Sequence, residues 1–197
     1  MEPPIVVRPF PEAVREQAAR LYFAAFERKI GGILSRDGRG IRFLTDVIDP
    51  AFGFAALSAD QSRLLGIAGF KTSEGSLVGG SFGDLKQHYG LIGSLWRALA
   101  LAPMERDIEP SRLLMDGIAV VPEARGMGIG SKLLDAICEH AAETGLDEVR
   151  LDVISSNPRA RSLYERKGFV AGEETDIGPL KHLYGFSQST TMIYSVP

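Results

Sequence analysis

Three alternating glycines, placed between an apolar strand pattern and an amphipathic helix pattern, constrain the fold of this chain more than any other feature. Leu113–Val121 is an apolar run that predicts a strand, and 128–144 carries apolar residues at helical spacing. The run Arg125-Gly-Met-Gly-Ile-Gly130 joins the two. Glycine lets backbone N–H groups approach a ligand closely, and a helix N-terminus carries about half a positive charge. The segment therefore predicts a phosphate-binding loop.

Two other phosphate-binding motifs fit this loop less well. A Walker A loop needs Gly-Lys followed by Ser or Thr, but here Gly130 is followed by Ser131 and then Lys132. A dinucleotide fingerprint needs Gly-x-Gly-x-x-Gly, and Ser131 stands where its third glycine would be, although Glu148 lies about where a ribose-binding acid is expected. A purely structural turn is a further alternative, but alternating glycines cost backbone entropy that a simple turn does not require.

The rest of the chain predicts one mixed α/β (α+β) domain over residues 1–197, with no internal repeat. We expect helices at 11–30, ended by Gly31 and Gly32, and at 40–48, 128–144 and 157–167. We expect strands at 5–7, 52–57, 64–71, 113–121, 149–154, 169–172 and 191–196. A helical segment within about 80–110 interrupts this order and is interpreted as an insertion, either a lid over a site, a dimer surface or ordinary packing.

Composition excludes several classes of partner. The chain has 22 Lys and Arg against 25 Asp and Glu, so its net charge of -3 favours neither nucleic acid nor an anionic membrane. A single cysteine, Cys138, cannot form an internal disulfide and favours a reducing compartment. The N-terminal residues do not resemble a secretory signal, and the apolar segment 90–104 is too short to cross a bilayer. We therefore expect a soluble, cytoplasmic protein.

Two motifs in this order resemble the GNAT superfamily of N-acetyltransferases. Its acetyl-CoA motif, Arg/Gln-x-x-Gly-x-Gly/Ala, is matched by Arg125, Gly128 and Gly130. The run Asn157-x-x-Ala-x-x-Leu-Tyr164-x-x-x-Gly-Phe169 is similar to the family's downstream motif. The resemblance covers about 113–170 closely, the preceding hairpin loosely, and the first 50 residues only by the order of elements.

The resemblance implies a mostly antiparallel central sheet, flanked by helices, whose two middle strands splay apart to hold acetyl-CoA. The pantetheine arm would lie against 118–120, and the pyrophosphate on amides between Gly126 and Ser131. The implied cofactor-binding residues are Ile118, Ala119, Val120, Arg125, Gly126, Met127, Gly128, Ile129, Gly130, Ser131 and Asn157. Asn157 is equally well placed as a helix N-cap, and both roles can hold together.

Acetyl transfer from a thioester to an amine needs a neutral amine, a stabilised oxyanion and a protonated leaving sulfur. Tyr164 matches the family's general acid, and a backbone N–H near Val120 would meet the oxyanion. We expect Asp116 to be the base, because strand alternation would place it on the same side as Ile118. Glu123 and a bound water are the alternatives. Cys138 is expected to be a small buried residue rather than a nucleophile.

The sequence therefore favours an acetyl-CoA-dependent N-acetyltransferase with an unidentified amine acceptor. A non-catalytic acyl-CoA-binding regulatory module is the alternative, and Tyr164 argues against it. The three histidines have no ligand spacing, so no metal is expected, and His140 is interpreted as a surface residue. Glu173, Glu174 and Asp176 are interpreted as a solvated loop. Trp96 and its apolar neighbours are compatible with a homodimer, and the sequence leaves the oligomeric state open.

Overall fold

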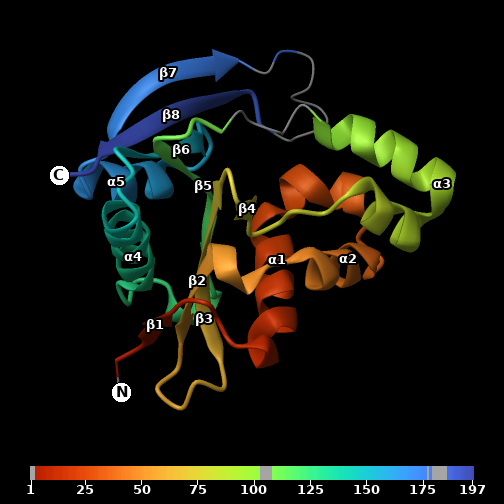
Figure 1. Ribbon diagram of the computed structural model, residues 1–197, viewed down its shortest axis with the longest axis horizontal. Coiled ribbons are helices and arrows are strands. Elements are labelled where there is room, and N and C mark those ends of the chain that lie inside the picture. Colours follow the sequence, from red (N-terminus) through yellow and green to blue (C-terminus); the bar gives the residue numbers. More distant parts are fainter. Residues whose placement is uncertain (1–2, 103–107, 177, 179–185) are drawn as a thin grey trace.

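One twisted sheet with helices on both faces forms the body of the molecule (Figure 1). The computed structural model describes residues 3–102, 108–176, 178 and 186–197. The strands are β1 (Ile5–Val7), β2 (Gly53–Leu57), β3 (Leu64–Thr72), β4 (Gly75–Ser76), β5 (Arg112–Val120), β6 (Glu148–Ile154), β7 (Val170–Asp176) and β8 (Gln188–Ser195). Their order is β1-β2-β3-β5-β6-β8-β7, with β4 paired to β3. All pairings are antiparallel except that of β5 with β6, which confirms the expected mixed, mostly antiparallel fold class.

The helices divide between the two faces of the sheet. They are α1 (Arg15–Leu34), α2 (Arg39–Val47), α3 (Phe82–Leu101), α4 (Ile129–Glu143) and α5 (Pro158–Arg166). Figure 1 shows α1, α2 and α3 on one side and α4 and α5 on the other. Each side has its own apolar core: Phe23, Ile33 and Leu44 belong to the first, and Leu133 and Ile137 belong to the second.

The start of α4 lies close against β3 because Gly66 has no side chain. A Cβ at Gly66 would lie 3.0 Å from Leu133 Cδ1 and 3.1 Å from Ile129 Cγ2, both on α4. At these distances the Leu133 and Ile129 side chains would have to shift, so the present packing of α4 on β3 depends on the glycine. The sheet therefore fixes where the N-terminus of α4, and the glycine loop before it, can lie.

The expected end of the first helix at Gly31 and Gly32 is wrong, since α1 continues to Leu34. Two glycines cost a helix interior roughly 2 kcal/mol relative to alanine. Ile30, Ile33 and Leu34 are all buried in the core shared with α2, and this packing outweighs the glycine cost. Tertiary burial thus overrides the local signal.

The second half of α3 has its polar and apolar faces reversed with respect to solvent. A left-handed Gly90 (φ 68°) kinks the helix. Beyond the kink, Ser94 and Arg97 are 0% and 7% exposed, whereas Ile92 and Leu99 are 85% and 77% exposed. The Arg97 guanidinium stacks 3.9 Å from the Tyr89 ring and donates a hydrogen bond to Ser35 Oγ. Part of the expected 80–110 insertion, 103–107, lies outside the described residues.

Two surface expectations are corrected. Glu173, Glu174 and Asp176 belong to the exposed edge strand β7 rather than to a loop. His140 is 8% exposed, with its ring 5.0 Å from that of Phe70, and burial lowers its pKa. His88 contacts Asp46 at 2.9 Å, and His182 lies outside the described residues.

Among the described helices, none combines the length and the apolar character needed to cross a membrane.

Candidate active site

The two middle strands separate after three residue pairs. Parallel pairing of β5 with β6 joins 112–114 to 148–150 and stops there. Beyond that point β5 stays paired with β3 as far as Val120, and β6 stays paired with β8 as far as Ile154. Each strand therefore continues with its outer neighbour while the inner edges diverge. This confirms the expected splay.

A β-bulge at Asp116 changes the direction of β5 where the separation begins. Met115 pairs with Phe70 and Gly117 pairs with Gly69, so the register skips Asp116. Met115 and Ile118 consequently contact the same α4-side core although they are three positions apart. The expectation that simple alternation groups Asp116 with Ile118 is wrong, because a bulge inserts one extra residue into the strand.

The bulge brings Asp116 near α1. Burial, with a further contribution from the Asp116 carboxylate, raises the pKa of the Tyr22 phenol above its ordinary value. Gly117 makes the approach of α1 possible, since a Cβ there would lie 2.3 Å from Phe26 Cζ. Sequence reasoning did not identify Tyr22 as a site residue.

A cavity of about 270 Å³ occupies the separation and reaches both α1 and α5. It is lined by Tyr22, Ala25, Phe26, Arg28, Lys29, Lys71, Leu114, Met115, Asp116, Gly117, Ile118, Leu151, Asp152, Val153, Ile154, Asn157, Ala160, Tyr164 and Phe186. Four of the expected site residues meet here: Asp116, Ile118, Asn157 and Tyr164. The remaining expected residues, Ala119, Val120 and the loop from Arg125 to Ser131, lie outside this lining.

Tyr164 enters the cavity from α5 and is 5% exposed. Its ring centroid lies 5.9 Å from that of Phe169, and burial raises the pKa of Tyr164 to about 12. The phenol is therefore protonated throughout the neutral pH range and can act as a hydrogen-bond donor. Asn157 caps the same helix, because its Oδ1 accepts a hydrogen bond from Ala160 N at 3.2 Å. The N-cap role is thus confirmed, and cofactor contact by Asn157 stays a prediction.

The glycine loop leaves backbone amides open at the start of α4. Gly126 (φ 87°) and Gly128 (φ 77°) are left-handed, and nothing lies within 4 Å of where a Cβ would be at either position. The first-turn amides of a helix have no acceptor within that helix, so those of Ile129, Gly130 and Ser131 are available to an anion. Arg125 Nε donates to Val120 O at 3.2 Å, which connects the loop to the end of β5.

Sequence reasoning also missed cavity-lining residues on two further elements, α1 and β6. On α1, the residues Tyr22, Ala25, Phe26 and Lys29 face the cavity at helical spacing. On β6, Asp152 alternates with the buried Leu151 and Val153 and accepts a hydrogen bond from Thr191 Oγ1 at 2.7 Å. The period of each element was visible in the sequence, but the neighbouring elements that each face contacts were not.

Neither a metal centre nor a reactive thiol is found among the described residues. Within the described ranges, no three His, Cys, Asp or Glu side chains are grouped so as to hold a metal ion. Cys138 lies on α4, and burial raises the pKa of its thiol to about 12. A thiol with this pKa is almost entirely protonated at neutral pH and is a poor nucleophile.

Sequence comparison relates this chain to known acetyltransferases. The profile of the Acetyltransferase (GNAT) family matches residues 16–169. Thialysine N-epsilon-acetyltransferase of Bos taurus is 41% identical over 56 residues, which are 28% of this chain and 33% of that protein. Mycothiol acetyltransferase of Paenarthrobacter aurescens is 42% identical over 65 residues, 32% of this chain and 20% of that protein. The matched segments thus span a third or less of these relatives.

Solved structures share the fold over three quarters or nearly all of the chain. An N-acetyltransferase from Staphylococcus aureus Mu50 gives a TM-score of 0.66 at 16% identity, covering 96% of this chain and 100% of the other. Ard1 from Thermoplasma volcanium gives 0.63 at 17% identity, covering 100% and 99%. A Bacillus subtilis acetyltransferase in complex with CoA gives 0.50 at 15% identity, covering 74% and 76%. At these identities the likeness concerns the fold alone.

Proposed function

Since the chain belongs to the GNAT acetyltransferase family, we propose that it transfers the acetyl group of acetyl-CoA directly to a primary amine, with Tyr164 as the general acid. The single observation that carries this proposal is the separation of β5 from β6, with Asp116 and Tyr164 in one cavity between them. A binding module would need the separated strands and the glycine loop. It would have no need of a buried phenol and a carboxylate in the same cavity.

The described residues fit acetyl-CoA, the co-substrate of GNAT-fold acetyltransferases. The inner edge of β5 beyond Leu114 is separated from β6, so backbone groups of 118–120 can pair with an extended pantetheine arm as with an added strand. The first-turn amides of Ile129, Gly130 and Ser131 suit the pyrophosphate, and Arg125 precedes them in the same loop. Asn157, at the start of α5, would add a side-chain contact from the opposite strand. Bound there, acetyl-CoA would supply the activated acyl group.

Three groups of this chain would serve the three chemical tasks. Asp116 would accept the proton of the acceptor amine, which arrives from the α1 side of the cavity. A backbone N–H near Val120 would stabilise the oxyanion, and Tyr164 would donate a proton to the departing sulfur. Glu123 is the weaker candidate base, because it lies exposed in the turn 122–124, outside the cavity lining.

Replacing Ser131 by Glu should weaken CoA binding without harming the helix. A carboxylate in the first turn of α4 is favourable to the helix dipole but repels a pyrophosphate. Because 1.4 kcal/mol corresponds to tenfold in affinity, a modest repulsion suffices for at least about tenfold weaker binding. Ser131→Gln has nearly the same size without the charge and is the matched control. Calorimetric titration with CoA measures both variants, and equal affinities would exclude this loop as the pyrophosphate site.

Tyr164→Phe should lower kcat at least about tenfold and leave the KM for acetyl-CoA nearly unchanged, because general acid catalysis contributes about 10²–10⁴ in rate. Since the pKa of Tyr164 is about 12, wild-type activity should show no loss from phenol ionisation up to pH 10. Release of free thiol from acetyl-CoA with a panel of amines measures the rate. Tyr194→Phe, a tyrosine outside the cavity lining, is the control. Full activity of Tyr164→Phe would refute the assignment of the acid, and CoA binding without any turnover would favour the regulatory module.

Asp116→Asn should lower kcat/KM at neutral pH by about 10²–10⁴. An alkyl ammonium has a pKa near 10.4, so activity without the base should rise steadily toward alkaline pH as more acceptor becomes neutral. Asp152→Asn removes the same charge from the same cavity and is the matched control. If Asp116→Asn keeps wild-type activity at pH 7, Glu123 or a bound water, and not Asp116, accepts the proton of the acceptor amine. An equal fall in kcat/KM in both variants would show that the negative charge of the cavity matters, and not a specific role of Asp116 as the base.

A homodimer through α3 is also part of the proposal. Phe82, Leu91, Ile92, Leu95, Trp96 and Leu99 are the large exposed apolar residues of this helix. Ile92, Leu95 and Leu99 have the three-four spacing of a helix-packing seam. A contiguous exposed apolar surface of this kind marks an interaction site, and a standard interface buries roughly 800 Å² on each partner.

A second copy of the chain suits this surface better than a lipid bilayer does. A helix that lies on a membrane carries Lys or Arg on the face beside its apolar one. In 91–101 the only charged residue is Arg97, whose guanidinium stacks on Tyr89 and is buried. The exposed stripe is uncharged, so two copies can meet across a two-fold axis without repulsion.

Leu95→Glu should convert this dimer to a monomer, because it would bury a carboxylate in an apolar interface. Light scattering coupled to size-exclusion chromatography measures the mass, and circular dichroism checks that the variant is folded. Val170→Glu introduces the same charge at an exposed apolar residue on β7 and should leave the dimer intact. A monomeric wild-type protein would refute this part of the proposal.

A further inference from the structure

We infer that the acceptor is a small amine that also carries a carboxylate, held by Lys71 and Arg28 on the α1 side of the cavity. This inference rests on the proposed N-acetyltransferase activity, for which it names the substrate class.

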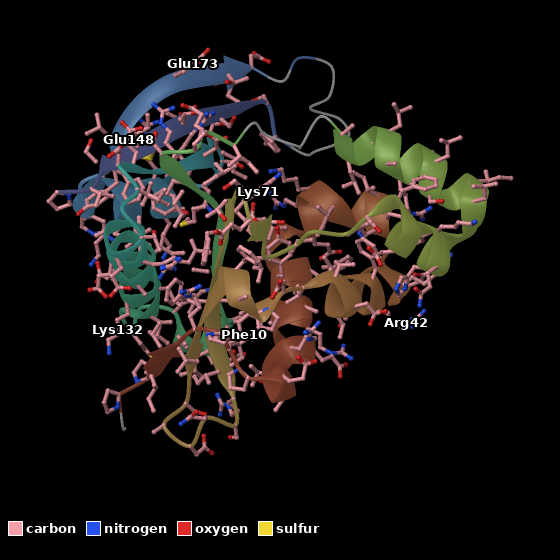
Figure 2. All side chains as sticks on the ribbon, in the orientation of Figure 1. Phe10, Arg42, Lys71, Lys132, Glu148 and Glu173 are labelled. Atoms are coloured by element: carbon pink, nitrogen blue, oxygen red, sulfur yellow. The ribbon has the colours of Figure 1, made fainter. Side chains whose placement is uncertain are left out.

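Lys71 lies on the strand beside Asp116 and on the α1 face of the sheet. Its Cα partner on β5 is Leu114, and Asp116 is two positions farther along. Lys71 and Asp116 both line the cavity, so the two side chains face the same space. The preceding residue, Phe70, belongs to the α4-side core, so the alternation of β3 turns Lys71 toward α1. Figure 2 shows Lys71 between the β5 end of the sheet and the helices α1 and α3.

Arg28 reaches the same cavity from α1, six residues after Tyr22. Among the residues that the structure describes, neither Arg28 nor Lys71 forms an ion pair. Both cations therefore keep their charge available to a ligand. Lys29, which also lines the cavity, stacks 5.8 Å from the Phe186 ring and adds a third positive charge.

The cavity thus holds carboxylates and cations together. Among the described lining residues, Asp116 and Asp152 carry negative charges, and Arg28, Lys29 and Lys71 carry positive charges. An acceptor that carries both an ammonium and a carboxylate matches this arrangement, with its amine at Asp116 and its carboxylate at Lys71 and Arg28. Such charge-assisted contacts are stronger than neutral hydrogen bonds, and Arg can bind a carboxylate through two parallel bonds.

Two other acceptor classes match the charges less well. In the described part of the lining, a polyamine would bring several ammonium groups close to three cations, and two carboxylates would face them. A phosphorylated amine would bring nearly two negative charges next to Asp116 and Asp152. Repulsion between like charges inside one cavity disfavours binding, and the low dielectric of a partly buried cavity strengthens this repulsion. The carboxylate-bearing amine is the class with no such conflict.

Matched acceptors test the inference in the thiol-release assay. The pairs are lysine with cadaverine, ornithine with putrescine, and phenylalanine with phenethylamine, together with the corresponding amino-acid amides. Phosphoethanolamine with ethanolamine covers the phosphorylated class. We expect the best carboxylated acceptor to show at least about tenfold higher kcat/KM than its decarboxylated or amidated partner, because tenfold corresponds to about one favourable charged contact.

Lys71→Gln should raise the KM for that carboxylated acceptor at least about tenfold, with kcat and the KM for acetyl-CoA little changed. The same variant should leave the KM of the decarboxylated partner unchanged, which a general structural defect would not do. Arg28→Gln should act in the same direction. Lys86→Gln, an exposed lysine on α3, is the control for charge removal.

The outcomes separate this inference from the function on which it rests. If decarboxylated amines, amides or phosphorylated amines are preferred while turnover is observed, the inference is overturned and the acetyltransferase proposal stands. Equal effects of Lys71→Gln on both members of a pair would also overturn it. If the wild-type protein turns over no amine of either class, the proposed function itself fails.

Discussion

The short parallel contact between β5 and β6 is the constraint on which the rest of the site depends. Three pairs of residues hold the strands together, and each strand then follows its outer neighbour. Because β3 and β8 continue to hold them, the separated ends are fixed parts of the sheet rather than frayed ones. Backbone polar groups on the inner edges need partners, and water or an extended ligand has to provide them. The opening is thus a rigid site created by sheet geometry.

The bulge at Asp116 and the glycine loop place different chemistry on the two faces of this opening. The bulge turns Asp116 toward α1, where Tyr22 and the cations of the cavity lie. The loop and α5 lie on the opposite face, with the open amides at the start of α4 and the capped helix that presents Tyr164. In the proposed reaction the two substrates would approach from these two faces. The cavity between the separated strands is lined both by α1 on one face and by α5 on the other.

Local patterns predicted the elements of the site, and tertiary contacts decided the rest. The glycine loop, the N-cap at Asn157 and the positions of the strands along the chain followed from residue types and spacing, because glycine, capping residues and apolar periodicity act within a few residues. The bulge at Asp116 depends on the register between β5 and β3, which a single strand does not reveal. The contribution of Tyr22 and Lys71 depends on which helix face and which strand lie beside β5. The continuation of α1 past Gly31 and the burial of His140 have the same origin, since both depend on packing partners that are distant in sequence.

The exposed strand β7 forms one end of the sheet, and among the described residues it pairs only with β8. Edge strands of this kind are templates for fibril growth, because a second molecule can extend the sheet by simple hydrogen bonding. Here Glu173, Glu174 and Asp176 line that strand, so an approaching copy of β7 would bring a second set of carboxylates into register with the first. Electrostatic repulsion between identical edges therefore protects the folded protein from uncontrolled polymerisation, and acidification, which neutralises these side chains, would remove that protection.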